Sequence, residues 1–152
     1  MKIILSIIIL ILFLSGYSYS KDLTLTCKFI SSTFFYGLKA KTITKNEMIK
    51  QGLPIKDEIY VINANTKKIL RKSFDEFVPL SKSLDNFDIV WSRYDITWYY
   101  EILTDVFHKS NLNRSTGVLT HDSRYGEKSV LAEEGITRTS NTYKCEISEK
   151  LF

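Results

Sequence analysis

The chain has 152 residues, of which 44% are hydrophobic and 25% are charged, and its formal net charge is +4. A chain of this length has the size of one domain with a hydrophobic core. The basic residues are scattered along the chain and form no basic stripe. We therefore expect no nucleic-acid partner.

Residues 1–20 have the parts of a secretory signal peptide. A basic start precedes an apolar run over residues 3–14, and the small residues Ser18 and Ser20 follow, where cleavage requires them. The run of about 12 apolar residues is shorter than the roughly 20 that span a bilayer, which favours cleavage over a membrane anchor. We predict a secreted or periplasmic protein, with residues 21–152 as a single β-rich domain and no stable membrane span after cleavage.

The first elements of the predicted domain follow from hydrophobic alternation and capping. Residues 22–30 alternate apolar and polar side chains, which predicts a strand with Cys27 on its buried face. Residues 31–41 continue with β-forming residues and predict a second strand or a bent continuation of the first. Residues 44–52 predict a short helix, because a capping-box pair stands at its start and a glycine at its end.

A hairpin is predicted over residues 58–72, with asparagine and lysine clustered at its tip. Residues 73–84 are ambiguous. The spacing of their aromatic and leucine residues fits a short helix that ends near Val78, whereas Pro79 in the middle equally allows a loop that plugs an end of the sheet.

The middle of the chain predicts strands over residues 87–93 and 96–103, which a short link makes antiparallel neighbours. Because the second of these carries aromatic residues on both faces, we predict that it is a central strand. A strand over residues 106–112 leads to a turn at residues 113–117, where the glycine supplies a positive φ.

The last part of the chain predicts a loop over residues 122–128, one helical turn over residues 130–136, and a final strand over residues 140–147. Seven or eight strands are thus expected, mostly with short connections, and one or two short helices. We predict a mainly β fold, in which an antiparallel meander curls into a small barrel or a strongly twisted sheet and so avoids long exposed edges.

Two cysteines, Cys27 and Cys145, lie in the first and last predicted strands. In an exported chain an even number of cysteines indicates a disulfide. The alternative is a redox or metal-binding thiol pair, which would need a CxxC-like spacing or histidines nearby in the sequence, and neither is present. The predicted disulfide requires the first and last strands to lie side by side.

The most suggestive candidate for a ligand site is a group of aromatic residues on and between two predicted neighbouring strands: Trp91, Tyr94, Trp98, Tyr99 and Tyr100. Of these, Trp91, Trp98 and Tyr100 are the predicted ligand-binding residues. Aromatic side chains there can line a pocket in a small barrel. Packing in the core and across strands explains the same residues, so both readings stay open. Tyr99 points away from Tyr100, and an exposed aromatic residue would instead mark a protein-binding surface.

Metal sites and enzyme active sites are disfavoured. His108 and His121 flank the predicted turn, so they can converge with a carboxylate such as Asp122, but exposed strand positions explain them equally well. Nucleophilic catalysis needs a serine or cysteine beside a histidine, and the sequence has no G-x-S-x-G elbow. A glycosidase would need a pair of catalytic carboxylates, but the acidic residues are better explained as solvent-exposed positions on strands. We predict no metal, no cofactor and no enzymatic activity.

The layout resembles a set of small exported bacterial β-rich proteins of unknown function, which carry an Asn-Arg-x-Thr-Gly-x-Leu hairpin and a late cysteine. Here the hairpin is Asn113-Arg114-Ser115-Thr116-Gly117-Val118-Leu119, and Cys145 follows. The resemblance implies an exported β-rich domain and carries no catalytic residues. In architecture alone the layout is also similar to small periplasmic lysozyme-inhibitor barrels, although their inhibitory loop motif is absent here.

These observations predict an exported small binding module that recognises a small amphipathic molecule or a protein. The alternative is a structural or inhibitory partner protein that acts through an exposed face and has no small-molecule pocket.

Overall fold

The computed structural model of the protein describes residues 22–73, 75–83, 85–102 and 105–147. The strands are β1 (Leu23–Tyr36), β2 (Lys39–Thr44), β3 (Glu58–Asn63), β4 (Lys68–Ser73), β5 (Glu76–Pro79), β6 (Asp85–Trp91), β7 (Asp95–Ile102), β8 (Val106–Asn113), β9 (Val118–Tyr125) and β10 (Arg138–Ile147). The short helices are α2 (Lys45–Lys50), α3 (Leu80–Ser83) and α4 (Val130–Glu133). The predicted signal peptide lies outside the described residues.

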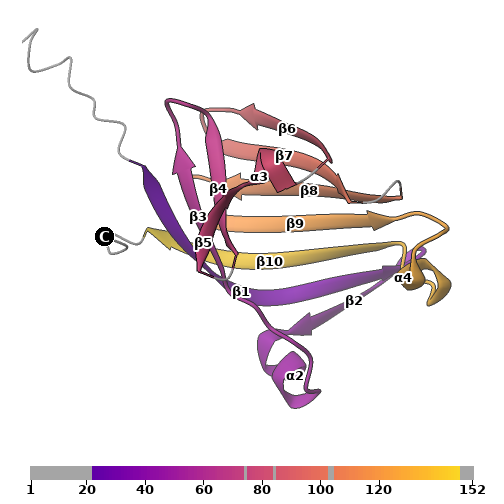
Figure 1. Ribbon diagram of the computed structural model, residues 1–152. Coiled ribbons are helices and arrows are strands. Elements are labelled where there is room, and N and C mark those ends of the chain that lie inside the picture. Colours follow the sequence, from indigo (N-terminus) through magenta and orange to yellow (C-terminus); the bar gives the residue numbers. More distant parts are fainter. Residues whose placement is uncertain (1–21, 74, 84, 103–104, 148–152) are drawn as a thin grey trace, which may run out of the picture.

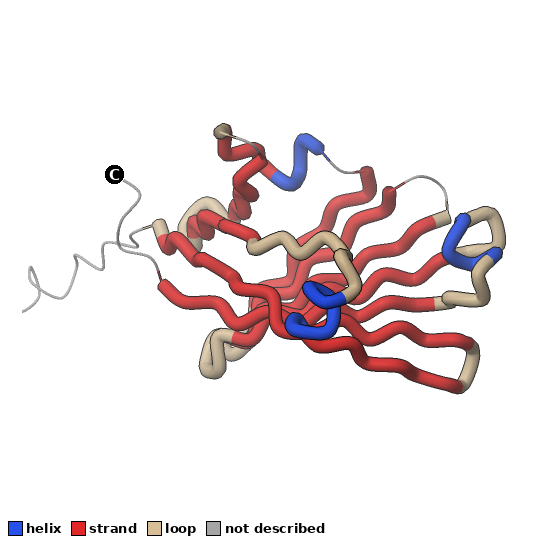
Figure 2. Tube along the Cα trace, turned by 90° about the horizontal axis from the view of Figure 1, so that it is seen from below, coloured by secondary structure: helices blue, strands red, loops and turns tan. Residues whose placement is uncertain are grey.

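All ten strands belong to one antiparallel sheet that curls into a half-barrel (Figures 1 and 2), which confirms the predicted fold class. The strand order is β5-β4-β3-β1-β10-β9-β8-β7-β6. The sheet is therefore two meanders joined where β1 pairs with β10, rather than one consecutive meander. The prediction that the strand over residues 96–103 is central is wrong, because β7 lies next to the edge strand β6.

The long strand β1 organises the sheet. It pairs with β10 along one side, and on the other side with β3 over its first half and with β2 over its second half. The register shifts between Phe29 and Ser31, which is the mark of a β-bulge, and a bulge bends a strand. The segment after Phe29 is thus the bent continuation that residues 31–41 allowed, followed by a turn at Gly37 and β2.

The predicted disulfide is confirmed. Cys27 and Cys145 are bonded and stand directly opposite each other in the register of β1 and β10. The first and last strands of the described fold therefore lie side by side at the centre of the sheet, as the cysteine pattern predicted. Both sulfur-bearing side chains face the concave side, where Cys27 is fully buried.

Two further sequence predictions are corrected. Residues 73–84 include neither a helix that ends near Val78 nor a plain loop: β5 forms there and pairs with β4, and α3 follows. Pro79 is tolerated because β5 ends the strand order, where a missing N–H need not break a ladder. Residues 122–128 are also not simply a loop, because β9 continues to Tyr125.

The extension of β9 has a physical reason that the polar sequence concealed. Ser123 and Tyr125 face the concave side and have partners there: the Ser123 hydroxyl lies 2.7 Å from His108 Nδ1, and the Tyr125 hydroxyl lies 2.9 Å from the Thr139 hydroxyl. Hydrogen-bonded polar side chains can thus occupy the inner face of a strand without a large desolvation penalty.

The helix predicted over residues 44–52 is confirmed as α2. Its N-cap residue, Thr44, accepts a hydrogen bond from the Glu47 backbone N–H, and the Glu47 carboxylate accepts one from the Thr44 backbone N–H. This reciprocal capping box satisfies two backbone donors that the first turn of a helix otherwise leaves free.

The turn between β8 and β9 approaches β10 closely at Gly117. Its φ is +65°, and a Cβ added to it would lie 2.7 Å from the carbonyl oxygen of Cys145. The backbone N–H of Cys145 also donates a 2.7 Å hydrogen bond to the Gly117 carbonyl. The substitution Gly117→Ala therefore has two costs: the strain of alanine in a left-handed backbone conformation, and a steric clash with the Cys145 carbonyl. We expect it to destabilise the fold by about 2–4 kcal/mol.

Gly37 provides the matched control for that measurement. Its φ is +59°, but an added Cβ would meet nothing within 4 Å. Gly37→Ala should therefore cost only the conformational penalty of about 1–2 kcal/mol. Urea unfolding of both variants measures the difference, and equal losses of stability would contradict the close approach of the turn to β10.

Candidate functional site

The three aromatic residues proposed from the sequence share one side of the sheet. Trp91, Trp98 and Tyr100 stand on β6 and β7 and face the concave side, where Trp98 is 1% exposed and Tyr100 is 9% exposed. The Trp98 ring lies 5.7 Å from the Tyr60 ring, and the Tyr100 ring stacks at 4.7 Å on His108. Their packing is that of a core, and their role as ligand-binding residues stays a prediction.

The two histidines also face the concave side, from neighbouring strands β8 and β9. His121 Nδ1 lies 2.6 Å from the Ser110 hydroxyl, and His121 Nε2 lies 2.8 Å from the Glu58 carboxylate and 3.1 Å from the Tyr60 hydroxyl. Tyr60 also hydrogen-bonds Glu58. We call Glu58, Tyr60, Ser110 and His121 the interior network.

The interior network contains the residue types of a nucleophilic triad, but its geometry is that of a structural cluster. Ser110 is fully buried, so a substrate cannot reach its hydroxyl in this conformation. In the serine hydrolase template Nε2 of the histidine faces the serine and Nδ1 faces the carboxylate, whereas His121 has the opposite arrangement. Within the described residues, no group of three or more His, Cys, Asp or Glu side chains converges as metal ligands.

Burial and charge shift the pKa values of this interior. Burial alone would raise the pKa of Glu58, but the hydrogen bonds from His121 and Tyr60 and the charges of His121 and Arg71 outweigh it, so the pKa is lowered. Burial and the nearby Glu58 carboxylate raise the pKa of Tyr60 well above its ordinary value. Burial also lowers the pKa of His108, with a smaller contribution from the charge of His121.

Sequence reasoning did not identify Glu58 as a member of a cluster. Its signal was nevertheless present, because Glu58 has the same strand parity as Tyr60 and Ile62, two apolar or aromatic residues that are buried. A carboxylate on the buried face of a strand needs a partner, and the two histidines were the candidates.

A hollow of about 490 Å³ opens at one end of the half-barrel, and we call it the mouth hollow. It lies where β1 begins, β10 ends and the chain turns from β8 to β9, three features that Figure 1 places at the same side of the sheet. Its lining residues are Leu23, Leu25, Ile96, Leu112, Asn113, Arg114, Ser115, Thr116, Gly117, Cys145, Glu146 and Ile147.

The mouth hollow has an apolar floor and a polar rim. The floor is made by the inward-facing side chains of Leu25, Ile96 and Leu112, which are 3–5% exposed. The predicted turn at residues 113–117 forms much of the rim. It is held by the Asn113 side-chain oxygen, which accepts hydrogen bonds from the backbone N–H groups of the two residues before Gly117.

In comparisons with known proteins, the chain matches no protein-family model, no curated protein and no solved structure. The resemblance to small exported bacterial proteins therefore stays a prediction. In the part of the chain that the structure describes, no helix has the length and apolar character needed to span a membrane.

Proposed function

We propose that the protein is a small binding module that takes up a small amphipathic molecule in the mouth hollow. The observation that carries this proposal is the combination of an apolar floor with a rim that bears Arg114 and Glu146. Ligand sites in proteins commonly have apolar walls with a few polar groups that fix orientation, and the mouths of β-barrels are frequent places for them.

The size of the hollow supports a ligand with a short apolar body. Its volume of about 490 Å³ lies within the roughly 300–1,000 Å³ of small-molecule sites. Burying about six methylene groups there would gain roughly 5 kcal/mol. Association itself costs several kcal/mol, so a polar headgroup must add favourable contacts at the rim to reach micromolar affinity.

The rim charges suggest where the headgroup would bind. The Arg114 guanidinium makes two long hydrogen bonds of 3.4 Å to backbone carbonyls of Ser92 and Arg93. Glu146 is engaged in a 3.7 Å ion pair with Lys28. Because the Arg114 contacts are long and exposed, a ligand carboxylate can replace them at little cost, and we propose an anionic headgroup.

The disulfide is consistent with an oxidising compartment outside the cytoplasm. We propose a secreted or periplasmic location on this basis and on the signal-like segment at residues 1–20. The alternative function, a partner protein without a small-molecule site, has its support in the exposed side chains of Val90, Tyr94 and Phe107, which are 51–59% exposed.

The proposal is tested by calorimetric titration of the protein with decanoate, in parallel for the wild type, Ile147→Asp and Val130→Asp. Ile147 is 65% exposed on the wall of the hollow, and Val130 is 70% exposed on α4, away from the lining residues. We expect Ile147→Asp to weaken binding at least about tenfold, because it places a carboxylate beside the apolar chain. Val130→Asp should bind like the wild type.

Two results would overturn this assignment. Absence of decanoate binding to the wild type would remove the proposed ligand class, and equal weakening by both aspartate variants would show that the effect is not local.

Arg114→Gln tests the headgroup. It should weaken the binding of decanoate more than the binding of the uncharged decanol, and equal losses of affinity would exclude the proposed role of Arg114.

A further inference from the structure

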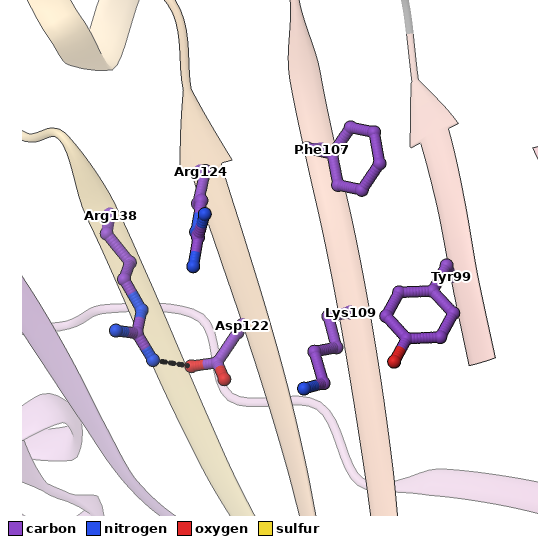
Figure 3. Close-up of a pocket in the computed structure, with 6 residues that line it drawn as sticks. All are labelled: Tyr99, Phe107, Lys109, Asp122, Arg124 and Arg138. Carbon is purple, nitrogen blue, oxygen red and sulfur yellow. Dashed lines mark hydrogen bonds and ion pairs between the residues drawn. The ribbon is translucent and has the colours of Figure 1, made fainter. Parts of the chain in front are cut away.

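We propose that a second hollow, on the outer face of the sheet, binds a small organic anion with an aromatic body. This hollow has a volume of about 320 Å³ and is lined by Tyr99, Phe107, Lys109, Asp122, Arg124 and Arg138 (Figure 3). It is separate from the mouth hollow, with which it shares no lining residue, and the proposal does not depend on the proposed function.

The register of four neighbouring strands brings these side chains together. Tyr99 on β7 stands opposite Lys109 on β8, and Lys109 stands opposite Asp122 on β9. In the next row Phe107 on β8 stands opposite Arg124, and Arg124 stands opposite Arg138 on β10. Directly paired residues on one face lie about 5 Å apart, so the two rows form one continuous patch.

Two of the three cations in the patch are already engaged. Arg138 donates a 2.8 Å hydrogen bond to the Asp122 carboxylate, and its guanidinium lies 4.9 Å from the centre of the Phe35 ring. Lys109 lies 5.7 Å from the centre of the Tyr99 ring. The contacts of Arg138 hold its guanidinium in place at the β10 end of the patch. The contact of Lys109 holds its ammonium group beside the Tyr99 ring.

Arg124 is the exception. Its guanidinium makes no ion pair and no hydrogen bond within the described part of the chain, and Figure 3 shows it between Arg138 and Phe107. The Asp122 carboxylate accepts a hydrogen bond from Arg138. Glu101 on β7 stands opposite Phe107 and has an interaction partner as well. Three cations and these two carboxylates leave the patch positive, with one guanidinium fork open to an anionic oxygen pair.

The aromatic part of the ligand is indicated by Phe107. Its ring is 52% exposed on the outer face, although burial of a phenyl group is energetically favourable. In the strand register, Phe107 stands directly opposite Arg124. A planar ring can pack against Phe107 while its carboxylate, sulfonate or phosphate pairs with Arg124 and Lys109. We therefore assign to the patch a small aromatic acid rather than a simple inorganic anion.

The experiment is a titration monitored by calorimetry with three probes: 2-naphthoate, its uncharged amide and inorganic phosphate. The proteins compared are the wild type, Arg124→Gln, Phe107→Ala and Lys39→Gln, where Lys39 is an exposed lysine on β2 outside the patch. We expect the wild type to prefer naphthoate over both other probes. Arg124→Gln should weaken naphthoate at least about tenfold, since it removes a charge-assisted pair.

The other variants separate the two halves of the recognition. Phe107→Ala should weaken naphthoate but leave the weak phosphate binding unchanged, and Lys39→Gln should leave both unchanged. Naphthoate affinity should fall as salt is added, because exposed charges are screened. Equal binding of the amide and the acid, or an equal effect of Arg124→Gln and Lys39→Gln, would overturn the assignment. Loss of naphthoate binding in Ile147→Asp would place the probe in the mouth hollow instead.

Discussion

Removal of the Cys27–Cys145 disulfide is expected to lower the free energy of unfolding by about 2–5 kcal/mol. The bond joins residues 118 positions apart, and in the chain-entropy account a loop of that length restricts the unfolded chain by about 5 kcal/mol. It also joins β1 to β10 at the centre of the sheet, where the two meanders meet. The double variant Cys27→Ala, Cys145→Ala should therefore unfold at a much lower urea concentration.

Reductant provides the control for this measurement. Adding it to the wild type should shift the urea midpoint toward that of the double variant, whereas it should have no effect on the double variant itself. The residual difference between the reduced wild type and the double variant reports the cavity left at two side chains that are at most 7% exposed. An unchanged midpoint of the wild type in reductant would show that the bond does not constrain the unfolded chain.

The strands could largely be predicted because their alternation is local. Leu25, Cys27 and Phe29 are buried as their spacing predicted, and the two cysteines alone predicted that the ends of the domain meet. The errors arose where the inner face of the sheet is polar. Ser123 looked like a loop residue, since sequence does not show that His108 accepts or donates a hydrogen bond to it across the strands.

The candidate sites depend on contacts that no local pattern contains. Glu58 and His121 are 63 positions apart and meet only because the sheet curls β3 toward β9. The outer patch likewise needs the register of four strands to bring Phe107, Arg124 and Arg138 into adjacent positions. A shift of one residue in any of these pairings would send a side chain to the opposite face, so the patch could not be predicted before the register was known.

The interior network leads to the second large expected effect. Glu58→Leu should lower the free energy of unfolding by about 3–5 kcal/mol. It removes the carboxylate to which His121 and Tyr60 hydrogen-bond, while both of these polar side chains stay buried. Glu58→Gln keeps an acceptor oxygen of similar shape and should cost less, about 1–2 kcal/mol. Glu146→Leu is the control, because its 3.7 Å ion pair is exposed and is worth under about 1 kcal/mol.

The pH dependence of stability tests the same network independently. The pKa of Glu58 is lowered in the fold from its ordinary value of 4.5. The unfolded chain therefore binds the proton more readily than the folded chain, so this contribution is fully present above about pH 4.5 and is lost as the pH falls through the lowered pKa. Urea unfolding between pH 7 and pH 3 should show a smaller acid loss of stability for Glu58→Gln than for Glu146→Gln. If Glu58→Leu were as stable as the wild type, or if the acid loss of stability were undiminished in Glu58→Gln, the Glu58 carboxylate would not stabilise the fold. His121 would then be held by its hydrogen bonds to Ser110 and Tyr60 and by its ring contacts.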